Sequence, residues 1–254
     1  MRRTTESEIL QAALRQSAID SHCDWRDFLR EENVTVVSRA DERARKYLQL
    51  PFDCDLVSYG SNVVASVRPE LLDAVRDYLH SRPAAHCFET PALHTLDGLL
   101  RPLGLQVRHM AEYFLPETGR LTARSCGYEI RRLSPADFEA LYTPQWSNAL
   151  CEARRQLDVM GMGAFDGGEL VGLAGASADC ESMWQIGIDV LPAYRKRGIA
   201  SALTSRLALA ILQHGKVPFY CAAWSNIPSV RNALRSGFRP AWVELTAKRA
   251  EETA

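Results

Sequence analysis

Apolar residues in the second half of the chain recur with two spacings, which predict alternating strands and helices. Four short apolar segments have the composition of strands: 158–165, 169–177, 183–190 and 217–223. Between the last two, Ile199, Leu203, Leu207 and Ile211 recur every four residues. This spacing places them on one face of a helix, which we expect over 198–213.

Residues that favour turns and helix ends complete this series. Ser134 followed by Pro135 predicts a helix start after a strand at 128–133. Asp166-Gly167-Gly168 is typical of a tight hairpin. A helix at 227–236 and a strand at about 240–247 end the series. The order β-α-β-β-β-α-β-α-β predicts an α+β fold, a mixed α/β sheet covered by helices.

The first half has a less regular pattern. Helical stripes appear within 4–50, including Arg43–Leu48, around a short strand at Asn33–Val37. Strand-like alternation over 55–67 surrounds a turn. We expect helices at 69–80 and 90–103, the second ended by Gly104, then a strand at 105–115. The polar segment 116–127 is the best linker, so we predict an N-terminal α/β domain at 1–120 and a second domain at 128–247.

Composition narrows the function classes. The chain has 254 residues, 46% of them hydrophobic and 24% charged, with a net charge of −1. These values are typical of a globular protein. The net charge gives no positive field that would attract nucleic acid. Seven cysteines without a Cys-x-x-Cys pair favour reduced thiols, a cytoplasmic location and no zinc site. We expect no signal peptide, metal or membrane partner, and either a monomer or a homodimer.

Residues 195–200, Arg-Lys-Arg-Gly-Ile-Ala, are the strongest candidate for ligand chemistry. They lie where a strand gives way to a helix. The first turn of a helix has unpaired N–H groups and a dipole that favours anions. Gly198 and Ala200 keep this backbone accessible, so the segment fits a pyrophosphate. The alternative is a basic, solvated surface.

Two motifs stand at a fixed spacing in the second half of the chain. The first is Arg195-x-x-Gly198-x-Ala200 after a strand ending Ile188-Asp189-Val190. The second begins at Asn226 and closes a helix on Gly237-Phe238. These motifs, their spacing and the strand order resemble the GNAT superfamily of acyl-CoA-dependent N-acyltransferases over about 128–247. The resemblance implies acetyl-CoA as co-substrate, with its pantetheine arm paired to the fourth strand of the family fold, here 183–190.

The resemblance also implies a set of cofactor-binding residues. Strand backbone would bind pantetheine, the helix start would bind pyrophosphate, and the second motif would contact the arm. For Asn226 and Ser229 the alternatives are a helix cap and first-turn polarity. The implied residues are Ile188, Asp189, Val190, Arg195, Lys196, Arg197, Gly198, Ile199, Ala200, Ser201, Asn226 and Ser229.

The acid and base are less well defined. Many family members carry a Tyr acid seven residues after the Asn, where this chain has Ala233. Asp189 and Tyr220 are the candidate catalytic bases, although a strand-end Asp is often a cap and a Tyr between apolar residues is often core. Glu181 and Glu244 are weaker candidates.

The function that this resemblance implies is direct acetyl transfer to the amine of a small molecule. Because Ala233 replaces the usual acid, a non-catalytic acyl-CoA-binding sensor or interaction protein stays open. A protein N-acetyltransferase is a further alternative.

The N-terminal half carries a second resemblance. Asp24–Phe28, Glu32–Val34 and Tyr59–Val64 are similar to a bacterial GNAT subgroup that includes the zwittermicin-resistance acetyltransferase. Leu99–Leu105 echoes Ala233–Phe238, since each segment closes a helix before a strand. The echo gives the hypothesis that this half is a degenerate GNAT half, and chance similarity is the alternative. We expect it to cover the acceptor or bind regulators.

Overall fold

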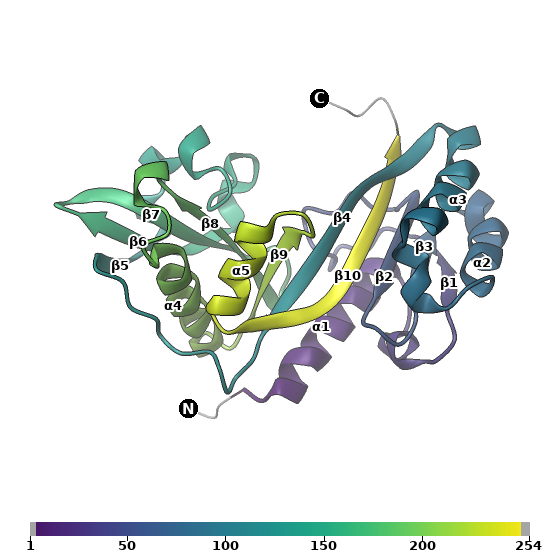
Figure 1. The fold of residues 1–254 in the computed structure, drawn as a ribbon, viewed down its shortest axis with the longest axis horizontal. Coiled ribbons are helices and arrows are strands. Elements are labelled where there is room, and N and C mark those ends of the chain that lie inside the picture. Colours follow the sequence, from purple (N-terminus) through teal and green to yellow (C-terminus); the bar gives the residue numbers. More distant parts are fainter. Residues whose placement is uncertain (1–3, 250–254) are drawn as a thin grey trace. The chain divides into compact units, whose positions relative to one another are not determined.

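The computed structural model describes residues 4–249, which form two compact units. Unit 1 contains residues 4–12 and 114–240, and unit 2 contains residues 13–113 and 241–249. Three elements contribute residues to both units: α1 (Glu6–Ser21), β4 (Leu105–Pro116) and β10 (Phe238–Arg249) (Figure 1). The C-terminal strand therefore supplies the last residues of unit 2.

Unit 2 is a mixed sheet with two helices on one face. Its strands lie in the order β1-β3-β2-β10-β4, where β1 is Val34–Val37, β2 is Cys54–Ser58 and β3 is Val64–Val67. β1 is parallel to β3, whereas β2 is antiparallel to both β3 and β10. The helices α2 (Leu72–His80) and α3 (Thr90–Leu100) bury apolar side chains against residues such as Leu56 and Leu245.

Unit 1 holds the series predicted for the second half of the chain. Its strands lie in the order β4-β9-β8-β7-β6-β5. Neighbouring strands from β5 to β8 are antiparallel, and β8 and β9 are parallel. The bounds are β5 Glu129–Leu133, β6 Asp158–Asp166, β7 Glu169–Ser177, β8 Met183–Val190, α4 Ile199–Gln213, β9 Val217–Ala223 and α5 Ile227–Arg235.

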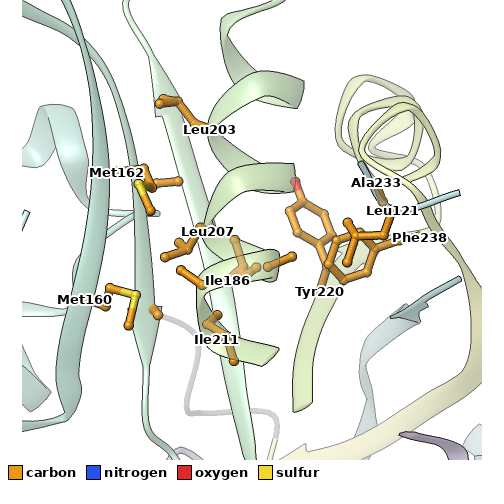
Figure 2. Packing of buried hydrophobic residues seen from close by; sticks show 14 of the residues in the cluster. Leu121, Met160, Met162, Ile186, Leu203, Leu207, Ile211, Tyr220, Ala233 and Phe238 are labelled. Carbon is orange, nitrogen blue, oxygen red and sulfur yellow. The ribbon is translucent and has the colours of Figure 1, made fainter. Parts of the chain in front are cut away.

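The core of unit 1 lies between the sheet and α4. Figure 2 shows Leu203, Leu207 and Ile211 of α4 beside the methionines of β6. These residues are the stripe that the four-residue spacing predicts, and each is fully buried. The predicted mixed fold is thus confirmed, with β7, β8 and β9 at the predicted bounds.

Two helix predictions are wrong. After Ser134 the chain forms only short 3₁₀ turns, Pro135–Asp137 and Glu139–Leu141, although Ser134 and Asp137 form a capping box. Arg43–Leu48 forms turns because the chain there turns the Arg45 side chain inward, onto Asp20 and Glu244. Tertiary charge pairing overrides the weak local helix preference in that segment.

Two further observations concern the cysteines and the length of the helices. All seven cysteines are free thiols. Within residues 4–249, every helix falls short of the length and apolar character needed to cross a bilayer.

Gly237 ends α5 in a left-handed conformation with φ +94°, and a Cβ there would lie 2.7 Å from Leu121 Cα and 2.9 Å from Arg120 O. Both neighbours are backbone atoms and cannot turn away. We therefore predict that Gly237→Ala lowers the free energy of unfolding by about 2–4 kcal/mol, measured by urea denaturation.

Gly215→Ala is the matched control, because Gly215 also has a positive φ (+72°) but open space around it. The backbone preference alone should cost about 1 kcal/mol there. Equal losses in the two variants would contradict the steric argument.

Candidate functional site

The parallel strands β8 and β9 separate soon after they begin. They pair only over Met183–Gln185 and Val217–Phe219. On its other side β8 stays paired with β7 from Gln185 to Val190. The β9-facing edge of β8 is consequently unpaired over 186–190, in the described part of the chain.

The peptide groups of β8 alternate in direction along the strand. This alternation decides which of them face the gap between β8 and β9. Leu191 N–H donates to Val171 O of β7, whereas Val190 O accepts from Arg195 on the opposite side. Successive residues of a strand point their peptide groups in opposite directions. The peptide groups of Ile186, Ile188 and Val190 therefore face the gap, and those of Asp189 face β7.

The segment after β8 forms an anion cradle, by which we mean the backbone N–H groups of residues 196–201. Lys196 (φ +64°) and Gly198 (φ +81°) are both left-handed. Gly198 is the N-cap of α4, and the first helical bond is Ala202 N–H to Gly198 O. Within residues 4–249 none of the N–H groups at 196–201 donates to a backbone carbonyl. Such a turn before a helix concentrates donors at one point.

The three basic side chains beside the cradle have different environments. Arg195 Nε donates to Val190 O at 3.1 Å, which holds the turn against the end of β8. Arg197 donates to the Tyr128 hydroxyl at 2.7 Å and lies over the Tyr194 ring. Lys196 is exposed and forms no hydrogen bond with a described side chain or backbone group. Two of the three cations thus already contact the protein.

Asp189 holds a loop against the sheet. Its Oδ2 accepts hydrogen bonds from the backbone N–H groups of Asn148 and Ala149, at 2.9 and 3.0 Å, and its Oδ1 accepts from the Asn148 amide at 2.7 Å. The loop lies so close that a Cβ on Gly187 would be 1.8 Å from Asn148 O. The geometry therefore gives Asp189 a positioning role in place of the backbone contact expected from the sequence.

Tyr220 is the first residue of β9 beyond the paired stretch. Its hydroxyl lies 2.7 Å from Ser229 Oγ, and the side chain is 2% exposed. Figure 2 shows the ring near Phe238 and Ala233, which is fully buried. Burial raises the pKa of Tyr220, so its hydroxyl keeps its proton near neutral pH. A protonated hydroxyl can donate a proton but is a poor base.

The remaining predicted site residues make local contacts within the fold. Asn226 caps α5, with Oδ1 accepting from Ser229 N–H at 3.3 Å, as its alternative interpretation expected. Glu181 is exposed and accepts a bond from Lys216 at its backbone carbonyl. Glu244 is buried in unit 2 against Arg45.

Asp158 is a titratable residue that the sequence analysis did not single out. Its Oδ2 accepts from Cys151 N–H at 2.8 Å and from the Tyr142 hydroxyl at 3.3 Å. It pairs in register with Ser177, which pairs with Gln185 where β8 and β9 part. Burial raises the pKa of Asp158 to about 6. An Asp at a strand start is indistinguishable in sequence from a turn residue, so no local pattern marked it.

Together these elements define a class: a mixed-sheet protein with a split parallel strand pair that leads to a helix-start anion cradle. The sequence model of the GNAT acetyltransferase family matches residues 109–241, a little over half of the chain. The chain belongs to the GNAT acetyltransferase family. No curated protein matches the chain.

Three solved structures of low sequence identity are similar to this chain. A GNAT-family putative acetyltransferase from Novosphingobium aromaticivorans is 18% identical with a TM-score of 0.46, covering 57% of this chain and 66% of its own. A Drosophila protein is 14% identical with a TM-score of 0.48, covering 99% and 92%. An aminoglycoside N-acetyltransferase in complex with CoA is 22% identical with a TM-score of 0.36, covering 47% and 92%. The chain thus spans just under two thirds of the first of these proteins.

We predict that Asp158 makes the protein less stable as pH rises. Its folded pKa of about 6 lies above the ordinary value of 3.8, so the folded state holds the proton more tightly. The stabilisation is full below about pH 4 and is lost as pH rises through 6, a loss of about 2–3 kcal/mol. Urea titrations between pH 4 and 8 would measure it.

Asp158→Asn should remove this decline, because the amide keeps an acceptor for Cys151 N–H but does not titrate. Asp137→Asn is a control at an exposed carboxyl whose pKa is lowered by Ser134. If the wild-type and Asp158→Asn profiles ran parallel across pH 4–8, Asp158 would not be the titrating group.

Proposed function

We propose that this protein is an acetyl-CoA-dependent N-acetyltransferase that acts on the amine of a small molecule. The observation that carries the proposal is the continuous path from the unpaired edge of β8 to the anion cradle before α4. An extended pantetheine arm carries amide groups that can pair with such an edge as an added strand would. Its pyrophosphate is the anion that a helix start with free N–H groups favours.

The residues present fit this co-substrate. Ile186 and Ile188 would offer peptide groups to the arm, and Val190 would offer its N–H. The backbone of Lys196–Ser201 would bind the pyrophosphate, with Lys196 free to add charge. Arg195 contributes by fixing the turn, since its Nε already donates to Val190 O. Asp189 keeps the covering loop in place.

In the transfer, the acceptor nitrogen forms a bond to the thioester carbonyl carbon and the carbon–sulfur bond breaks. The acceptor must first lose an ammonium proton to a base. Peptide N–H groups at the β8 edge would stabilise the charge on the carbonyl oxygen. The departing thiolate takes a proton. Tyr220, held by Ser229 and kept protonated by burial, is the donor that we propose in place of the Tyr missing at 233.

Asp158 is our candidate for the base. Its pKa of about 6 leaves it mostly ionised at neutral pH and still able to accept a proton. It lies on the sheet face that the loop at 148–149 covers, two strands from β8, so a proton would reach it through water. This assignment replaces Asp189, whose carboxylate oxygens are occupied by Asn148 and Ala149.

A non-catalytic acyl-CoA-binding protein is the second candidate, favoured by Ala233 at the usual acid position. It shares the β8 edge and the cradle with the enzyme and differs only in turnover. Release of CoA thiol across a panel of small amines, or of peptides for a protein acceptor, separates the candidates. Tight acetyl-CoA binding without thiol release would favour the second one.

We predict that Gly198→Asp weakens acetyl-CoA binding about hundredfold or more. The substitution places a carboxylate where the cradle would hold phosphate, at a φ of +81°, and the loss of a few charge-assisted hydrogen bonds is of this size. Isothermal titration calorimetry would measure the dissociation constant.

Gly168→Asp is the matched control, because this hairpin glycine is also left-handed (φ +94°) with open space around it. It should bind acetyl-CoA as the wild type does. Wild-type affinity in a folded Gly198→Asp variant would overturn the cofactor site.

We also predict that Tyr220→Phe lowers kcat about tenfold or more, an effect smaller than general acids usually give because CoA thiolate is a fair leaving group. The dissociation constant for acetyl-CoA should change less than twofold. Tyr78→Phe removes a buried hydroxyl that donates to Cys87 O in unit 2 and serves as the control. An unchanged kcat and pH profile in Tyr220→Phe would show that its hydroxyl only supports packing.

A further inference from the structure

The sheet of unit 2 has one apolar face and one face that carries buried charge. Cys54, Leu56 and Leu245 belong to the apolar core under α2 and α3. In the antiparallel pair, Asp55 lies opposite Thr246, and Glu244 lies two residue pairs further along, opposite Val57. Because side chains alternate along a strand, Asp55, Thr246 and Glu244 share the other face.

The Arg45 guanidinium pairs with two carboxylates on that face. Arg45 Nε lies 2.5 Å from Asp20 Oδ2, and its NH2 group lies 3.0 Å from Glu244 Oε2. The remaining Arg45 nitrogen donates to the Tyr47 hydroxyl. All three charged side chains are at most 4% exposed. Each of the three guanidinium nitrogens thus already donates to a partner.

Asp55 is bound by Thr246, whose hydroxyl donates to Asp55 Oδ1 at 2.6 Å. Burial, and then the nearby Glu244, raises the pKa of Asp55 well above its ordinary value. Glu244 differs from Asp55, because the Arg45 guanidinium donates to its Oε2. Its other oxygen, Oε1, accepts no hydrogen bond from any residue in 4–249.

A cavity of about 350 Å³ adjoins Glu244. Thr246 and Tyr113 lie beside Glu244 in its lining, and Tyr47 and Leu48 contribute apolar surface from the facing segment. The other charged lining groups have partners: Lys248 donates to Gln49, and Asp53 pairs with Arg68. A cavity of this size holds a small organic molecule, with one buried carboxylate oxygen to orient it.

We propose that this cavity is a binding site for a small organic molecule bearing a protonated amine, whose ammonium group donates to Glu244 Oε1. Glu244 lines the cavity, and an ammonium ion there supplies its carboxylate with both a hydrogen bond and the opposite charge. Leu48 and Leu50 in the lining offer the apolar surface that the carbon skeleton of such a ligand needs, because the Tyr47 and Tyr113 rings already face Arg45. An anion is disfavoured, because every Arg45 nitrogen already faces a partner. The site lies wholly within unit 2 and does not depend on acetyl transfer.

The test is calorimetric titration of the full chain, without acetyl-CoA, using phenethylamine as the probe and 2-phenylethanol as its uncharged isostere. We expect saturable binding of the amine below about 10 mM, corresponding to a few kcal/mol, and no binding of the alcohol. Equal binding of both would overturn the charge argument. No amine binding would show that the cavity holds water only.

Glu244→Gln should weaken amine binding roughly tenfold or more, by loss of a charged hydrogen bond. Glu89→Gln, an exposed carboxyl in unit 2, is the matched control. Because Glu244→Gln leaves Arg45 with one partner fewer and can fail to fold, His109→Trp at the exposed mouth provides a second, steric block. Undiminished binding in His109→Trp, or in folded Glu244→Gln, would place the amine elsewhere.

Gly198→Asp separates this proposal from the acetyltransferase function. It should lose acetyl-CoA and keep the amine, whereas His109→Trp should do the reverse. Loss of amine binding in Gly198→Asp would mean that the amine binds at the cofactor site, which would overturn the proposal for the unit 2 cavity.

Discussion

The candidate active site depends on one constraint, the failure of β8 and β9 to stay paired. A strand edge with unpaired peptide groups is costly away from water, so parallel neighbours ordinarily remain paired until one strand ends. Here β8 is held on its β7 side as far as Val190, while Tyr220 and Ala222 of β9 pack into the core. The two strands therefore part, and the exposed edge leads to the helix that begins after Gly198.

Under the proposed function, fixed peptide groups, more than the basic side chains, would give this site its affinity for anions. The motif suggests three cations, but Arg195 and Arg197 already hold Val190 O and the Tyr128 hydroxyl. Exposed charges on flexible side chains contribute little because water and salt screen them. Two left-handed residues orient the N–H groups of 196–201 before any ligand arrives. Binding therefore loses less conformational entropy than it would with a flexible segment.

The sequence predicts most elements of unit 1 because each depends on local spacing. β7, β8 and β9 begin and end where apolar runs do, and α4 follows its four-residue stripe. The role of Asp189 depends instead on a loop forty residues away in sequence, which no local pattern encodes. The same holds for Asp158, whose burial comes from the segment that covers it. The parting of β8 and β9 has no local signal in the sequence, since strand register is a property of the folded sheet.

The two units share a physical feature: polar groups that are positioned by the fold but not used by it. In unit 1 these are peptide groups at a strand edge, and in unit 2 the group is Glu244 Oε1. Buried ion pairs generally add little to stability, and an apolar set of similar volume is often as stable or more so. Folding alone therefore gives no advantage to three buried carboxyls around Arg45. A ligand that donates to the remaining oxygen would give that arrangement a free energy of binding that an apolar core could not provide.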